Sequence, residues 1–123
     1  MRWANDSKVT PQLRDSVAWM CMQLMPDRDL SEFMGEVLSC MAFETGYSFS
    51  PSVRNPYSNA TGLIQFMPNT ARSLGTTVDE LAKMTQVEQM NYVYRYFLPY
   101  KNRRGNLGDV DLAIFYPAAM NKP

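Results

Sequence analysis

The stretch LSEFMGEVLSCMAFETG, residues 30–46, decides the fold of this chain. Its apolar residues recur at steps of three and four, which is the spacing of the buried face of an amphipathic helix. These apolar residues are Leu30, Phe33, Met34, Val37, Leu38 and Met41. The next position on the same face is Glu44, and Gly46 predicts that the helix ends shortly afterwards.

Glu44 is therefore a carboxylate at a position where the helix pattern expects a core residue. A carboxyl group on an apolar face loses solvation, which disfavours its charged form and raises its pKa. A carboxylic acid that stays protonated near neutral pH can serve as a general acid. The alternative is that Glu44 lies at a fraying helix end and turns to solvent.

The rest of the pattern predicts an all-α chain with little or no sheet. Further helices are expected over residues 11–25, 68–75, 78–83, 85–98 and 109–116, with threonine or aspartate at most of the capping positions. In the helix at 85–98 the apolar face is predicted to consist of Val87, Met90, Val93, Tyr94 and Phe97. Residues 46–61 form a long polar loop, a kind that is often functional. The apolar segment 62–67 predicts either a strand or a buried turn.

Bulk composition bounds the function. The 123 residues suit one domain, and 46% hydrophobic with 20% charged residues indicates an ordinary folded chain. A net charge of zero argues against electrostatic binding of nucleic acid by the molecule as a whole. The sequence has no stretch of ~20 apolar residues, so no integral membrane segment is predicted. Residues 1–10 also lack a signal-peptide core. Because the sequence stops soon after the last predicted helix, we expect a minimal domain, residues 1–123, or a fragment of a longer chain.

Histidine is absent, which excludes His-based triads and His-ligated metal sites. The two cysteines, Cys21 and Cys40, fall on different predicted helices and cannot form a Cys-rich metal site alone. Buried free thiols are the favoured interpretation, although a disulfide is geometrically possible if these helices pack together. No metal and no organic cofactor are expected.

Two motifs point to a known family. Glu44, Thr45 and Gly46 end a helix, a polar loop follows, and then comes ATGLIQFMPNTA, residues 60–71. This arrangement resembles the lytic transglycosylases of the soluble, goose-type-lysozyme-like superfamily, particularly phage versions that degrade cell walls. The segment AIFY, residues 113–116, is a further match, and the resemblance covers roughly residues 30–119.

The resemblance implies a lysozyme-like helical domain with a groove that binds the glycan strands of peptidoglycan. It implies that Glu44 is the single catalytic acid/base. It also implies a set of substrate-binding residues: Thr45, Gly62, Gln65, Met67 and Tyr116. Thr45 replaces the family's usual serine and keeps the hydroxyl. The family's Tyr-Asn-Ala-Gly segment reads Tyr-Pro-Ala-Ala here, at residues 116–119.

Such an enzyme cleaves the β-1,4 bond between N-acetylmuramic acid (MurNAc) and N-acetylglucosamine (GlcNAc). Residues 46–61 contain no Asp or Glu, so a second carboxylate is not evident, and a single glutamate predicts transglycosylation with a 1,6-anhydromuramic acid product. A second carboxylate would have to fold over the groove from elsewhere, and the candidates are Asp79, Glu80, Asp109 and Asp111.

Two alternatives stay open. One is a hydrolytic muramidase on the same fold, and the other is a non-catalytic glycan-binding or phage structural domain. For a phage enzyme we expect synthesis in the host cytoplasm and action on the cell wall, in the periplasm, after release or as part of a virion. Other modules of a virion or lysis protein are then possible partners.

Overall fold

The computed structural model describes residue 3 and residues 5–101. Within them the chain is all-α, as predicted, and no sheet forms. The elements are α1 (Pro11–Leu24), α2 (Leu30–Glu44), α3 (Pro68–Ser73), α4 (Val78–Ala82), α5 (Gln86–Phe97) and the short 3-10 helix η1 (Leu98–Tyr100). Two isolated bridges, Arg54 with Thr61 and Thr61 with Phe66, are the extended pairings among the described residues.

The caps that the sequence predicts begin these helices. The hydroxyl of Thr10 accepts a hydrogen bond from the Leu13 N–H, and Pro11 follows at the first helical position. Asp29 caps α2, and its side chain accepts a hydrogen bond from the Glu32 N–H. Thr85 and Glu88 form a reciprocal capping box at the start of α5.

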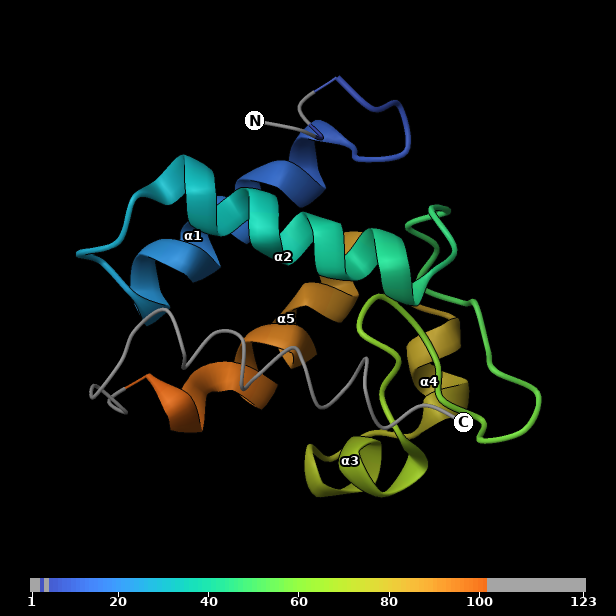
Figure 1. Ribbon diagram of the computed structural model, residues 1–123. Coiled ribbons are helices and arrows are strands. Elements are labelled where there is room, and N and C mark those ends of the chain that lie inside the picture. Colours follow the sequence, from blue (N-terminus) through green and yellow to red (C-terminus); the bar gives the residue numbers. More distant parts are fainter. Residues whose placement is uncertain (1–2, 4, 102–123) are drawn as a thin grey trace.

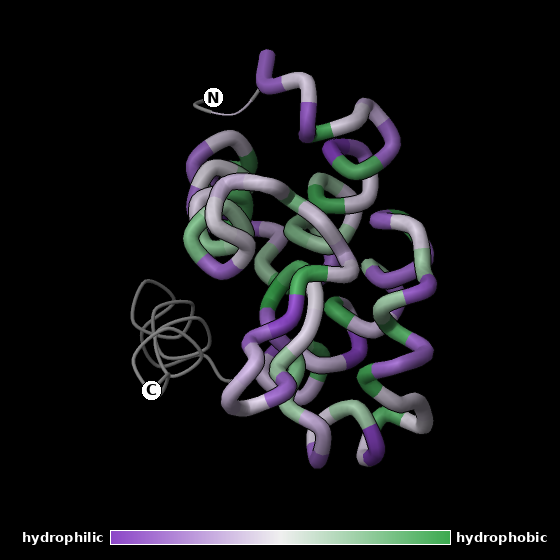
Figure 2. The backbone as a smooth tube through the Cα atoms, turned by 90° about the vertical axis from the view of Figure 1, so that its right-hand side faces the viewer, coloured by the Kyte–Doolittle hydropathy of each residue, from purple (hydrophilic) through white to green (hydrophobic). Residues whose placement is uncertain are grey.

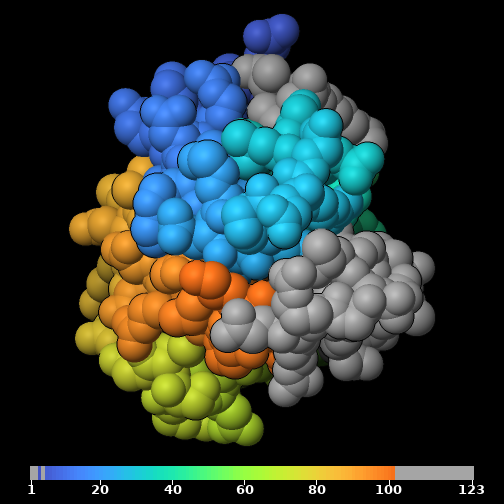
Figure 3. All heavy atoms as spheres, turned by 90° about the vertical axis from the view of Figure 1, so that its left-hand side faces the viewer, coloured from blue at the N-terminus to red at the C-terminus, as the bar shows by residue number. Residues whose placement is uncertain are grey.

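Three long helices make the core. Helix α1 packs against both α2 and α5, and Figure 1 shows α2 crossing above α5. Figure 3 shows the face on which α1 and the first turns of α2 lie beside α5. The central side chains are at most 2% exposed: Leu13, Val17, Phe33, Val37, Leu38, Met41, Val93 and Phe97. Burying each such side chain contributes about 1.5–3 kcal/mol. Figure 2 shows hydrophobic and hydrophilic residues alternating along these helices, as one-sided burial requires.

Helix α5 departs from its predicted face at two positions. Val87, predicted to be buried, is 39% exposed, whereas the polar Gln89 is fully buried. The cause is the rotation of the helix: Met90, Val93 and Phe97 are buried, and the face they define passes through position 89 rather than 87. Helix α5 ends at Phe97, one residue before its predicted end, and the 3-10 helix η1 follows it through Pro99 to Tyr100.

The segment between α2 and α3 has no regular structure except its bridges. Residues 46–61 form the predicted long loop, and residues 62–65 form a buried turn rather than a strand. Figure 1 shows this turn beside the C-terminal end of α2, and its Leu63 shares the hydrophobic core with Met41 and Ala42 of α2. The fold therefore brings the two halves of the sequence motif to one place.

No disulfide joins Cys21 and Cys40 in the structure. Burial raises the pKa of the Cys21 thiol to about 12, so the thiol stays protonated and behaves as a small apolar side chain. None of the helices in the described part of the chain has the length and apolar character needed to cross a membrane. The predicted helix at 109–116, including Tyr116, lies outside the described residues.

Candidate functional site

Glu44 is the last residue of α2 and is 8% exposed, with both carboxylate oxygens buried. It does not turn to solvent, because the buried face that contains Met41 continues to the helix end. The helix then stops at once. The N–H of Tyr47 donates to the carbonyl of Ala42 at 2.7 Å, and Gly46 has a φ of +61°. This glycine-based C-cap fixes the carboxylate at the junction between a helix and a loop.

Thr45 locks the beginning of the loop. Its buried hydroxyl donates to the carbonyl of Met41 at 2.7 Å and accepts from the N–H of Phe49 at 2.8 Å. The Ser48 hydroxyl also donates to the Thr45 carbonyl at 2.8 Å. A hydroxyl has one proton to donate. In this structure the hydroxyl proton of Thr45 is used within the protein, by the Met41 carbonyl. In a hydrogen bond with a substrate, the Thr45 hydroxyl could therefore only accept.

The backbone between Glu44 and Gln65 is strained. Four residues other than glycine have a positive φ: Tyr47 at 68°, Phe49 at 52°, Asn59 at 63° and Gln65 at 56°. Such conformations are uncommon outside glycine and are often found at functional sites. Among the described residues all four lie in this one segment, and the Thr45 hydroxyl holds the second of them in place.

Gln65 closes the turn. The backbone of Thr61 and Phe66 pairs in both directions at 3.0 and 2.8 Å, and the N–H of Gln65 donates to the carbonyl of Gly62 at 3.0 Å. The side-chain Nε2 of Gln65 donates to the carbonyls of Val53 and Gly62, each at 3.0 Å. Both amide hydrogens hold the turn, so a contact between Gln65 and a ligand would use its Oε1 atom.

Gly62 is required for packing inside the protein. The side chain of Gln89 fills the space that a side chain at residue 62 would need. A Cβ atom at Gly62 would lie 2.4 Å from Oε1 of Gln89, and the φ of +91° is also unfavourable for other residues. Met67, in contrast, is 47% exposed and open to a ligand.

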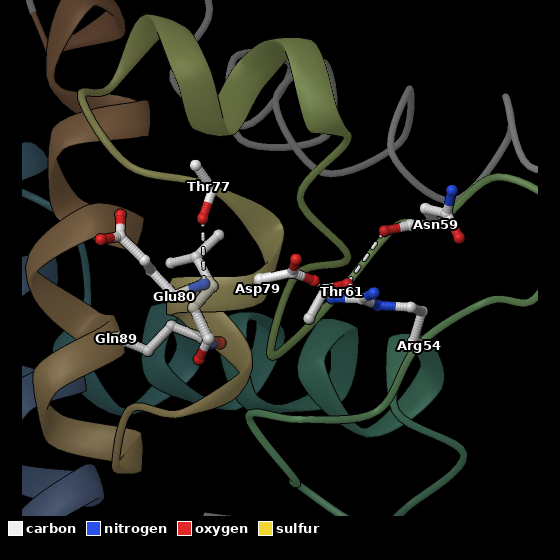
Figure 4. A network of polar contacts seen from close by, with 8 residues as sticks. Arg54, Asn59, Thr61, Thr77, Asp79, Glu80 and Gln89 are labelled. Carbon is white, nitrogen blue, oxygen red and sulfur yellow. Dashed lines mark hydrogen bonds and ion pairs between the residues drawn. The ribbon is translucent and has the colours of Figure 1, made fainter.

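An ionic and polar network fastens the other side of the turn (Figure 4). Arg54 donates from Nε to the Thr61 hydroxyl and from Nη2 to the carboxylate of Asp79, both at 2.9 Å. The Thr61 hydroxyl donates in turn to the carbonyl of Asn59 at 2.9 Å. Asp79, one of the candidates for a second carboxylate, is therefore ion-paired. Glu80, another, accepts a hydrogen bond from the Thr76 hydroxyl at 3.0 Å.

Sequence reasoning missed three residues at this site. Phe43 and Tyr47 flank Glu44 in the chain and are 61% and 58% exposed, and Tyr47 also packs against Trp3 with ring centroids 6.3 Å apart. The third is Gln89, a polar side chain on the apolar face of α5. The signal that singled out Glu44 would have found it, since position 89 lies four residues before Val93.

No protein-family model, curated protein or solved structure matches this chain. Among the described residues no three His, Cys, Asp or Glu side chains gather as metal ligands. The site is thus defined by its own geometry: a buried carboxyl group at a helix end, beside a strained loop and a tightly fastened turn.

The role of Thr45 is testable by replacing it with valine. Thr45→Val keeps the side-chain shape but leaves the buried N–H of Phe49 without its acceptor, which should cost about 1–3 kcal/mol of the free energy of unfolding. Urea denaturation measures the loss. Thr45→Ser is the matched control and should retain most of the stability, because it keeps the hydroxyl. A valine variant as stable as the parent protein would show that this hydroxyl does not hold the loop.

Proposed function

We propose that this protein is a peptidoglycan lytic transglycosylase with a lysozyme-like helical fold. The proposal rests on one observation above all: the motif glutamate, Glu44, is buried at the end of an apolar helix face. The motif string at residues 60–71 supports it, because its turn lies beside the same helix end. We further propose that the protein acts on the cell wall, delivered by phage lysis or as a module of a virion.

The first chemical step is proton donation. Protonated Glu44 gives its proton to the glycosidic oxygen between C1 of MurNAc and O4 of GlcNAc. The C1–O4 bond breaks, and GlcNAc leaves with a free 4-hydroxyl group. The N-acetyl oxygen of MurNAc stabilises the positive charge that develops at C1, which is the role a second carboxylate plays in many glycosidases.

The second step returns the proton. The Glu44 carboxylate accepts the proton of the MurNAc C6 hydroxyl while the C6 oxygen bonds to C1. This closes a 1,6-anhydro ring and regenerates protonated Glu44, so no water is consumed. Asp79 is paired with Arg54 in the described structure, which favours this route over a water oriented by that carboxylate.

Three exposed side chains in or next to the motif segments suit a sugar polymer. Phe43, Tyr47 and Met67 are all 47% exposed or more. Aromatic rings offer flat apolar faces with little conformational entropy to lose, and they suit the apolar faces of sugar rings. We assign these three side chains to glycan contact.

Replacing the catalytic group tests the mechanism. Glu44→Gln is nearly isosteric but has no proton to transfer, so release of muropeptides from purified sacculi should fall by about 10²–10⁴-fold or more. Circular dichroism should show a folded variant. Glu32→Gln, on the exposed face of the same helix, is the matched control and should keep its activity. If Glu44→Gln kept a tenth of the parent rate, Glu44 would be dispensable.

The product distinguishes the proposed reaction from hydrolysis. Mass spectrometry of the released muropeptides should find 1,6-anhydromuramic acid ends, lighter by one water than reducing ends. Mainly reducing ends would identify a hydrolytic muramidase and require a second carboxylate. No released muropeptides, together with retention on sacculi, would identify a non-catalytic glycan-binding or structural domain.

The pH profile tests the protonation state. Because the first step needs protonated Glu44, the rate should fall as pH rises through the range in which this carboxyl group ionises. Turbidity of sacculi at a series of pH values measures this. A rate that stays constant from acid to alkaline pH would contradict general-acid catalysis by a carboxyl group. A chelator should leave the profile unchanged.

A further inference from the structure

Gln89 is a fully buried polar side chain at this site. It lies on α5 and is 0% exposed. A buried amide costs stability unless its hydrogen-bonding groups are satisfied. Here they are: Oε1 accepts from the N–H of Leu63 at 2.7 Å, and Nε2 donates to the carbonyls of Pro51 and Leu81, each at 2.9 Å. One side chain therefore joins the loop, the turn and helix α4 to α5.

The backbone of Gly62 packs closely against the side-chain amide of Gln89. Oε1, Nε2 and Cδ of Gln89 lie 2.4, 2.7 and 2.8 Å from where a Cβ of residue 62 would stand. Those distances leave no room for a side chain. The backbone of the turn therefore rests directly on the face of the Gln89 amide, and the amide sets the position of Gly62 as well as that of Leu63.

The position of Gly62 in turn fixes the position of Gln65. The Gly62 carbonyl accepts from both the backbone N–H and the side-chain Nε2 of Gln65. On the opposite side Arg54 pairs with Asp79 of α4, but the Asp79 side chain is 77% exposed, and exposed ion pairs stabilise little. Figure 4 shows Gln89 reaching from α5 toward α4, beside this network. The buried contact is the stronger of the two.

We infer that Gln89 is a positioning residue for the reaction: through Gly62 and Leu63 it sets where Gln65 stands beside the substrate. This inference rests on the proposed function, but the placement of the turn can be measured without it. Gln89 touches no reacting atom, and it acts by fixing the turn. Displacement of a catalytic site by about 1 Å can lower a rate about 100-fold.

Gly62→Ala displaces the turn while keeping the Gln89 side chain. Gly75→Ala is its matched control: Gly75 has a similar φ of +84°, but a Cβ there would meet only Nη2 of Arg95, at 4.0 Å. Both variants carry the same backbone strain. We expect kcat on soluble peptidoglycan fragments to fall about 10–100-fold in Gly62→Ala and to stay within about twofold of the parent in Gly75→Ala.

Gln89→Met removes the three hydrogen bonds and keeps an unbranched side chain. Gln86→Met is its matched control on the same helix, since Gln86 bonds to Thr10, Lys8 and Phe49 and to no residue of the turn. We expect kcat to fall by a factor similar to that of Gly62→Ala only in the folded Gln89 variant. A folded Gln89→Met protein with the parent kcat would overturn the inference.

Nuclear magnetic resonance separates this inference from the proposed function. The backbone amide signal of Leu63 and the side-chain amide signal of Gln65 should move in Gly62→Ala and Gln89→Met and stay in place in both controls. If the parent protein releases no muropeptides, the proposed function fails, and these signals still decide whether Gln89 positions the turn. Unmoved signals in folded Gly62→Ala and Gln89→Met would show that it does not.

Discussion

The amide of Gln89 is the constraint on which the site depends. The segment between α2 and α3 has no sheet and no helix to satisfy its backbone, yet much of it is buried. Buried backbone groups need partners. Two of these groups, the Pro51 carbonyl and the Leu63 N–H, find a partner in Gln89, which also donates to the Leu81 carbonyl of α4. A leucine at this position would fill the core equally well but leave those groups unsatisfied, at a cost of about 1–3 kcal/mol each.

The same constraint explains why strain accumulates next to Glu44. Positive φ at Phe49 and Gln65 costs of order 1–3 kcal/mol each, and it persists only when neighbouring contacts hold the backbone. Thr45 holds Phe49 from the helix end, and the turn on Gln89 holds Gln65. Thr45 lies at the end of α2 and Gln89 lies on α5. The segment between α2 and α3 is therefore held at two different helices.

The helices could be predicted from the sequence because their signals are local. Caps such as Thr10 and Thr85 and the three-and-four spacing around Val37 act within a few residues. The same spacing placed Glu44 on the apolar face, with a turn to solvent as the open alternative, and the structure shows it buried. The exposure of Val87 and the choice of a turn rather than a strand at residues 62–65 did not follow from local signals, because both depend on how α5 is rotated against distant segments. The packing constraint on Gly62 could not be predicted for the same reason: the atoms that approach it belong to a residue 27 positions away, Gln89.

The place of Glu44 also bears on the two halves of the proposed reaction. It lies at the C-terminal end of α2, where the helix dipole presents partial negative charge and disfavours a carboxylate by about 0.3–1 kcal/mol. Burial acts in the same direction. Both effects make the proton harder to donate to the glycosidic oxygen and easier to take back from the C6 hydroxyl. A group that must do both in turn works best when neither step is strongly uphill.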